Sequence, residues 1–151
     1  SGKNTLNEQL VSAIKHQLEQ SSTQRLKLVA NLPYNIATPL MANLMLLEIV
    51  PTTMMVTIQL ELAERIVALP STPDYGSFSV WLQSQADCDI VRKLPPHVFW
   101  PSPKVDSAIV RVVTNPQKRS EIRDLSSFNE FVRAIFIHRR KTLRNQLSHL
   151  H

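Results

Sequence analysis

The sequence predicts an α/β fold in which helices alternate with the strands of a mainly parallel sheet. Short apolar runs rich in β-forming residues recur four times along the 151 residues. Helical patterns, with apolar residues three or four positions apart, separate most of these runs. Prolines bound several of the segments, and the chain holds 10 prolines against only 2 glycines.

The first two elements are a helix and a strand. Residues 4–20 are typical of a helix with one apolar stripe, because apolar residues stand four positions apart at Leu6, Leu10, Ile14 and Leu18. Residues 26–30 form a short apolar run that predicts a buried strand.

The next helix is predicted to start with Thr38 as its N-cap and Pro39 as its first residue, and to end near residue 49 before Pro51. Residues 52–59 predict a second strand. This strand is apolar on both faces, so we expect it in the centre of the sheet.

Two short helices and two strands follow. Residues 60–69 predict a helix that ends at Pro70, and residues 77–86 predict another with Ser77 as its cap. Strands are predicted at 88–94 and 105–113, separated by a proline-dense loop. Since no helix lies between these last two strands, they could pair antiparallel at the sheet edge.

The C-terminal part is predicted to be helical after a polar stretch that resembles a linker. Ser127 and Glu130 have the spacing of a capping box. The apolar side of this helix is predicted to consist of Phe128, Phe131, Val132, Ile135 and Phe136.

Composition sets limits on function. The formal charge of +5 and a pI near 9.7 indicate, weakly, a polyanionic partner such as nucleic acid. The single cysteine, Cys88, fits a reducing compartment and predicts a cytoplasmic protein. No run reaches membrane-spanning length, no zinc-ligand spacing occurs, and two glycines exclude a glycine-rich phosphate loop in this chain.

The stretch "ANLPYNIATP" at residues 30–39 carries the clearest chemistry. Asn31 offers an amide oxygen, Pro33 stiffens the turn, and Tyr34 offers a flat face for a base. Oxygen acceptors on an exocyclic amine could direct its lone pair at a methyl donor, which is catalysis by positioning. An ordinary turn uses the same residue types, so "NLPY" (residues 31–34) alone is compatible with either a catalytic loop or a structural turn.

Longer segments resemble the KsgA/RsmA-type rRNA adenine N6-dimethyltransferases, which share a superfamily with the Erm methyltransferases. The stretch "NLPYNIATPL" is similar to their catalytic motif, and "DYGSFSVWLQ" to their YGxLSV helix. Similar matches in the same order are "QLELAERIVALP", "PPHVFWPSPKVDSAIVRV" and "RRKTLRNQL". The YG and VDS segments favour the KsgA branch.

The resemblance implies roles for particular residues. Asn31 and the carbonyls of Leu32 and Pro33 would contact the target amine, and Asn31 would also line the cofactor pocket. Tyr34 would stack on the adenine, and Phe99 would pack against its other side, although an aromatic between prolines is often only a core plug. Trp100 stands where the family varies and receives no role.

RNA contacts are expected from basic residues. The predicted set is Lys104, Arg139, Arg140, Lys141 and Arg144, which lie in the proline loop and in the basic tail. The alternative is that these charged side chains only form a solvated surface. Arg65 is not part of this set, because it stands four residues after Glu61 and is expected to form a helix-surface ion pair with it.

The resemblance implies S-adenosylmethionine-dependent dimethylation of two adjacent adenines in small-subunit (16S) rRNA, with the 30S precursor as partner in ribosome biogenesis. The alternative is a non-catalytic RNA-binding factor for ribosome assembly or transcription on the same scaffold. The intact "NLPY" and Phe99 favour the enzyme.

The family's S-adenosylmethionine-binding first half has no counterpart in this sequence. Residues 1–114 are therefore expected to be the C-terminal part of a Rossmann-like class I methyltransferase sheet. Residues 115–125 would be a linker, and 126–151 the start of a small all-helical RNA-binding domain. We expect the chain alone to be inactive, to expose a strand edge, and to self-associate through it.

Overall fold

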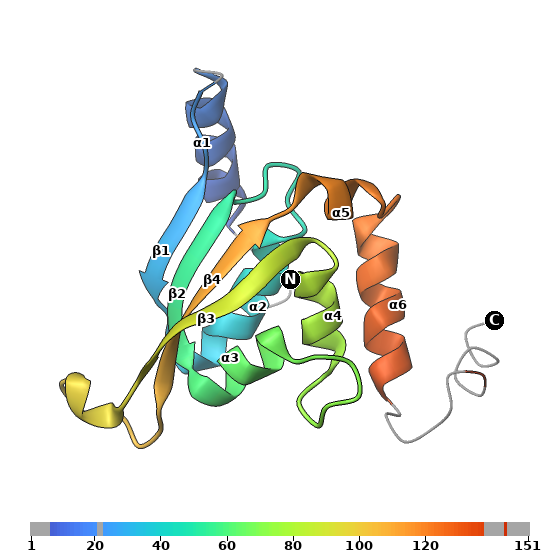
Figure 1. Cartoon of the computed structure of the whole chain (residues 1–151). Helices are drawn as coiled ribbons and strands as arrows, with labels where there is room; N and C mark the ends of the chain where they lie inside the picture. Colours follow the sequence, from blue (N-terminus) through green and yellow to red (C-terminus); the bar gives the residue numbers. More distant parts are fainter. Residues whose placement is uncertain (1–6, 21–22, 138–143, 145–151) are drawn as a thin grey trace.

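The computed structural model describes residues 7–20, 23–137 and 144. Its centre is a four-stranded sheet in the order β1-β2-β4-β3. The strands are β1 (Lys27–Asn31), β2 (Thr53–Gln59), β3 (Ala86–Leu94) and β4 (Ser107–Thr114). Figure 1 shows helices gathered on one face of this sheet, so the predicted α/β class is confirmed.

Three helices lie against the sheet: α2 (Tyr34–Leu44), α3 (Leu60–Val67) and α4 (Ser77–Gln83). Helix α6 (Leu125–Ile137) packs outside α4, and α1 (Glu8–Glu19) stands at one end of the sheet (Figure 1). No helix in the described part of the chain is long and apolar enough to span a bilayer.

The sheet is mixed, which corrects the prediction of a mainly parallel one. Only β1 and β2 run parallel, while β4 is antiparallel to both β2 and β3. The connection between β3 and β4 holds only the short 3-10 helix η1 (Pro96–Val98), and antiparallel pairing needs no crossover helix. Strand β4 lies inside the sheet, and β3 forms one edge.

The core is built from β2 and β4. Met54, Val56 and Ile58 are fully buried, and they face Val112, Val110 and Ala108, which are buried too. Burial of each large aliphatic side chain contributes roughly 1.5–3 kcal/mol. The central place predicted for residues 52–59 is confirmed, and the other sheet face carries the Arg111–Asp89 ion pair at 2.9 Å.

Strand β1 is an edge strand, whereas the sequence predicted a buried one. Among the strands that the structure describes, it pairs only with β2, and Val29 is 78% exposed. The alternation along the strand leaves Lys27, Val29 and Asn31 exposed and the residues between them partly covered. The expected open edge is therefore present.

Three predicted helix starts differ from the structure. Helix α2 begins at Tyr34, so Thr38 is not its cap and Pro39 lies inside it. In α4, Ser77 is the first helical residue after the N-cap Gly76, whose N–H donates to Ser79 Oγ at 3.0 Å. Helix α6 is capped by Asp124, whose carboxylate accepts from Ser127 N at 2.9 Å. In each case the observed N-cap residue (Pro33, Gly76 or Asp124) comes earlier in the sequence than the predicted one.

The predicted linker contains a short helix, α5 (Pro116–Ser120), capped by Asn115. Arg119 donates to the carbonyls of Met45 and Leu47, each at 2.7 Å, and to Gln85 Oε1. The guanidinium thus satisfies carbonyls of the chain that leaves the C-terminus of α2, at the C-cap Met45 and at Leu47. Burial lowers the pKa of Arg119.

Helix α6 packs through the apolar side predicted from its sequence except at Phe131, which is 42% exposed. Val132 is buried, and the rings of Phe128 and Trp81 lie 6.1 Å apart. Phe136 meets Tyr75 edge to face, also at 6.1 Å. The predicted helix-surface pair between Arg65 and Glu61 is confirmed in α3 at 2.8 Å.

Candidate nucleobase-binding site

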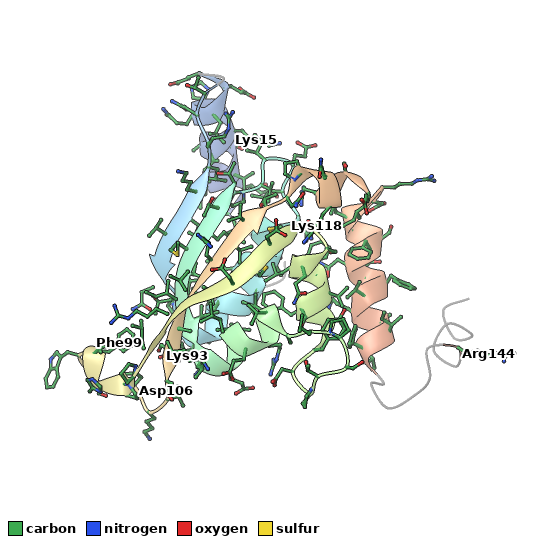
Figure 2. The ribbon with its side chains drawn as sticks, in the orientation of Figure 1. Lys15, Lys93, Phe99, Asp106, Lys118 and Arg144 are labelled. Carbon is green, nitrogen blue, oxygen red and sulfur yellow. The ribbon has the colours of Figure 1, made fainter. Side chains whose placement is uncertain are left out.

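A hollow of about 350 Å³ lies at the carboxyl end of β1. It brings together all of the predicted catalytic residues, from the β1–α2 loop and from the proline loop that carries η1. Its lining consists of Asn31, Leu32, Pro33, Tyr34, Phe99, Trp100, Pro101 and Pro103. Figure 2 shows Phe99 in the proline loop, beyond the ends of β3 and β4.

The loop after β1 is anchored at Leu32. Its backbone N–H donates to the Thr57 carbonyl of β2 at 3.1 Å, which continues the parallel ladder beyond Asn31. The Leu32 side chain is only 5% exposed and belongs to the core. Because both the backbone and the side chain of Leu32 are fixed, its neighbour Asn31 is held exposed at the rim of the hollow.

Pro33 is the point where the extended chain turns into α2. Its φ of -55° and ψ of 136° are followed by helical geometry at Tyr34. Its carbonyl accepts from Ile36 N at 3.1 Å and from Ala37 N at 3.2 Å. Of the two carbonyls that the sequence assigned to the target amine, that of Pro33 is therefore engaged by the helix.

Tyr34 is held in place by a residue of β4. Its phenolic oxygen lies 3.0 Å from Ser107 Oγ, and Ser107 is 1% exposed. The Tyr34 side chain itself remains 38% exposed. Sequence reasoning gave Ser107 no role, although it lies in the quoted "VDS" motif, because only the sheet topology brings it to Tyr34.

The proline loop is closed by short contacts. Phe99 N donates to the Pro96 carbonyl at 3.1 Å, and Ser102 Oγ donates to the same carbonyl at 3.0 Å. Phe99 is partly buried and borders the hollow, and it does not belong to the hydrophobic core of the sheet. Together with Tyr34 it supplies the aromatic surface on which a flat heterocycle could rest.

The predicted RNA contacts are divided between two regions. Lys104 is exposed in the proline loop, next to the hollow-lining Pro103. Arg144 is exposed too, but Figure 2 shows it across the molecule from Phe99. Arg139, Arg140 and Lys141 lie outside the described residues.

The part of the chain that the structure describes holds no candidate metal site, because no group of three or more His, Cys, Asp or Glu side chains there could hold an ion. Cys88 lies in β3, away from the hollow, and burial raises the pKa of its thiol to about 12. The site therefore offers oxygen acceptors and aromatic faces.

Sequence comparison connects this geometry with known proteins. The family model described as "Ribosomal RNA adenine dimethylase" matches residues 3–151. The chain is 45% identical over 133 residues to the ribosomal RNA small subunit methyltransferase A of Francisella tularensis subsp. novicida. That match covers 86% of this chain and 49% of the relative, so the chain spans about half the length of the curated relatives it matches.

Solved structures show the same fold. A dimethyladenosine transferase from Plasmodium falciparum matches with a TM-score of 0.75, at 21% identity, over 95% of this chain and 57% of its own. The 23S rRNA methyltransferase ErmE matches with a TM-score of 0.61, also at 21% identity, over 96% of this chain and 64% of its own.

Proposed function

Because this chain belongs to the ribosomal RNA adenine dimethylase family, we propose that the protein carrying it methylates N6 of adenine in small-subunit (16S) rRNA. The observation that supports this most directly is the hollow that joins Asn31 and Leu32 to Tyr34 and Phe99. The full proposal is dimethylation of two adjacent adenines on the 30S precursor, as a cytoplasmic step of ribosome biogenesis.

The amine contacts follow from the backbone of the loop. Asn31 Oδ1 and the Leu32 carbonyl would accept the two hydrogens of the adenine amine. The Pro33 carbonyl is left out because Ile36 and Ala37 already donate to it. Two acceptors on one side would pull the nitrogen towards pyramidal geometry and direct its lone pair away from the ring. This lowers the barrier by positioning and preorganised dipoles, and it needs no strong base.

The ring would be held between aromatic side chains. Adenine in a helix is stacked, so the target must first swing out of its stack. Tyr34 would then cover one face of the base, and Phe99 would pack on the other. The bond from Tyr34 to Ser107 supports this role, because it fixes the direction of the ring before the substrate arrives.

S-adenosylmethionine is the methyl donor that we propose, and it would supply the electrophilic methyl group. The residues at the hollow fit one side of such a donor, since Asn31 is exposed at the rim and brings a polar amide. We assign no other residue of this chain to the donor. The chain alone is accordingly proposed to be inactive.

RNA outside the target base would be held by cations. Lys104 stands next to the hollow and would contact phosphate. Arg139, Arg140, Lys141 and Arg144 would contact a more distant part of the RNA, from a second, helical domain at residues 126–151. Contacts of this kind weaken steeply as the salt concentration rises.

We further propose that the isolated chain self-associates through β1. The strand has a free edge in the described sheet, and Val29 is 78% exposed beside it. Unpaired strand edges are templates for pairing with another chain.

The decisive experiment is Asn31→Ala in the full-length protein, with Asn35→Ala as the matched control. Asn35 is an exposed amide four positions later that does not line the hollow. We expect Asn31→Ala to abolish methyl transfer to unmethylated small-subunit rRNA while rRNA affinity is retained, and Asn35→Ala to keep both. Methyl transfer that survives in Asn31→Ala refutes the assignment. Full-length protein with no turnover but normal RNA binding would support the non-catalytic alternative.

A further inference from the structure

Trp100 is the most exposed large apolar side chain in the described chain. Its exposed fraction is 98%, whereas that of Trp81, the other tryptophan, is 2%. An indole left fully in water forgoes the large burial energy that makes tryptophan useful in cores. Tryptophan is also among the residues most enriched in the centres of binding interfaces.

The loop that carries Trp100 is stiff rather than loosely attached. Pro101 follows it directly, and Pro95, Pro96 and Pro103 restrict the rest of the loop. The hydrogen bond from Ser102 Oγ to the Pro96 carbonyl, at 3.0 Å, ties the two sides of the loop together. At its base, Leu94 of β3 pairs with Ser107 of β4. The backbone that carries the indole is therefore held in a defined position at the end of β3 and β4.

Its position relative to the site is also defined. Trp100 borders the same hollow as Asn31, Tyr34 and Phe99. A nucleotide whose base occupied that hollow would lead its strand across the rim, where the indole stands. Lys104, four residues further on, is exposed and offers a cation for the phosphates of that strand.

We propose that the indole of Trp100 stacks on an unpaired RNA base next to the target adenine, and thereby sets the register in which the strand enters the hollow. This inference rests on the proposed function. Stacking on an aromatic side chain tolerates any base, because every base has a π face, so Trp100 contributes affinity and position without reading sequence. Trp100 is thus a positioning residue, distinct from the groups that touch the amine.

Fluorescence gives a direct test, because the two tryptophans differ so strongly in exposure. In a full-length protein that keeps Trp100 as its only tryptophan, with Trp81→Phe and phenylalanine at every tryptophan outside these 151 residues, the emission is expected to be quenched when an unmethylated hairpin RNA with the target adenines in its loop is added. In the matched protein that keeps only Trp81, with Trp100→Phe, the emission is expected not to change. Trp100 emission that stays constant at saturating RNA would overturn the proposal.

Kinetics give the second test. Removing one stacked base contact by alanine is expected to raise both the RNA dissociation constant and KM by about 5- to 150-fold. We expect kcat at saturating RNA to change little in Trp100→Ala, and Trp100→Phe to restore most of the affinity. Val98→Ala is the matched control, because Val98 is exposed in the same loop but does not line the hollow.

The outcomes separate the two proposals. If Trp100→Ala leaves KM unchanged while Asn31→Ala abolishes turnover, only the role of Trp100 falls. If Trp100→Ala removes a concentration-dependent dimer and leaves RNA affinity intact, the indole docks on a second copy and the proposal is wrong. If Asn31→Ala retains turnover, the proposed function fails whatever Trp100 does.

Discussion

The phenolic oxygen of Tyr34 lies 3.0 Å from Ser107 Oγ, although the two residues are 73 positions apart in the sequence. Tyr34 opens α2, and Ser107 opens β4, so the bond joins the loop after β1 to the strand that follows the proline loop. One segment that lines the hollow is therefore fastened to the strand that follows the other.

Loss of this bond is expected to slow methyl transfer modestly. Ser107→Ala and Tyr34→Phe each remove one hydrogen bond, which contributes about 0.5–1.5 kcal/mol and corresponds to a fall in rate of roughly 2- to 12-fold. The measurement is the single-turnover rate of the full-length protein. Since both changes break the same contact, the double variant should be no slower than either single one. Fully additive losses would show that the bond does not position the ring.

Arg119→Ala is expected to lower the free energy of unfolding by about 1.5–3 kcal/mol, because charged hydrogen bonds are lost and Gln85 Oε1 stays buried without its donor. Urea unfolding of the purified chain measures this. Arg119→Lys should recover only part of the loss, since an ammonium cannot reproduce the planar fork. Arg123→Ala, at an exposed position nearby, is the control and should leave stability unchanged.

Acid is expected to weaken the start of α6. The hydrogen bond from Ser127 N lowers the pKa of Asp124 in the folded chain. The stabilising effect is therefore complete above the unfolded-state pKa, about 3.9, declines as the pH falls below it, and is gone below the lowered folded pKa. Asp124→Asn keeps a capping oxygen without this titration. Its melting temperature should fall less steeply in acid than that of the parent, and parallel acid profiles would contradict the assignment.

Cys88 is expected to react slowly with thiol reagents in the folded chain. Burial raises the pKa of its thiol to about 12, so the reactive thiolate is scarce at pH 8. Alkylation by iodoacetamide at pH 8 should be much slower than in urea-unfolded chain, where the thiol has its ordinary pKa of about 8.5. Equal rates in the two states would show that β3 does not shield the thiol.

Self-association of the isolated chain is expected to depend on β1. Sedimentation should show species larger than a monomer at high concentration, and Val29→Lys should shift the distribution towards monomer, because a charge beside the strand edge opposes pairing. Leu69→Lys is the control, as Leu69 is also strongly exposed but lies outside the sheet. A clean monomer of the unsubstituted chain at high concentration would refute the self-association proposal.

Much of the architecture could be predicted because it depends on local patterns. The apolar character of residues 52–59 on both faces led to the central place of β2, and the apolar pattern of α6 led to the buried Val132, although Phe131 of the same pattern is exposed. Helix starts were harder to predict, because several residues near each boundary are good caps and only the backbone geometry at the boundary decides which of them accepts the hydrogen bond. Asp124 rather than Ser127 caps α6 for this reason.

In the candidate site, too, the residues could be predicted from sequence motifs, but their contacts could not. The residues of "NLPY" and Phe99 could be proposed from their motifs, and the structure does bring them to one hollow. The engagement of the Pro33 carbonyl could not be foreseen, since it depends on where α2 begins. The contact between Ser107 and Tyr34 requires β4 to lie beside β2, and nothing in the sequence pattern specified that order.

The insertion of β4 between β2 and β3 has a consequence for biosynthesis. While the chain is still being translated, β1 and β2 emerge long before their sheet is complete, and Tyr34 has no hydroxyl partner until Ser107 leaves the exit tunnel. Synthesis at about 5–20 residues per second makes this an interval of several seconds. The Tyr34 hydroxyl is thus fastened only after Ser107 has emerged, even though Tyr34 itself is made early and the loop backbone can already pair with β2 at Leu32.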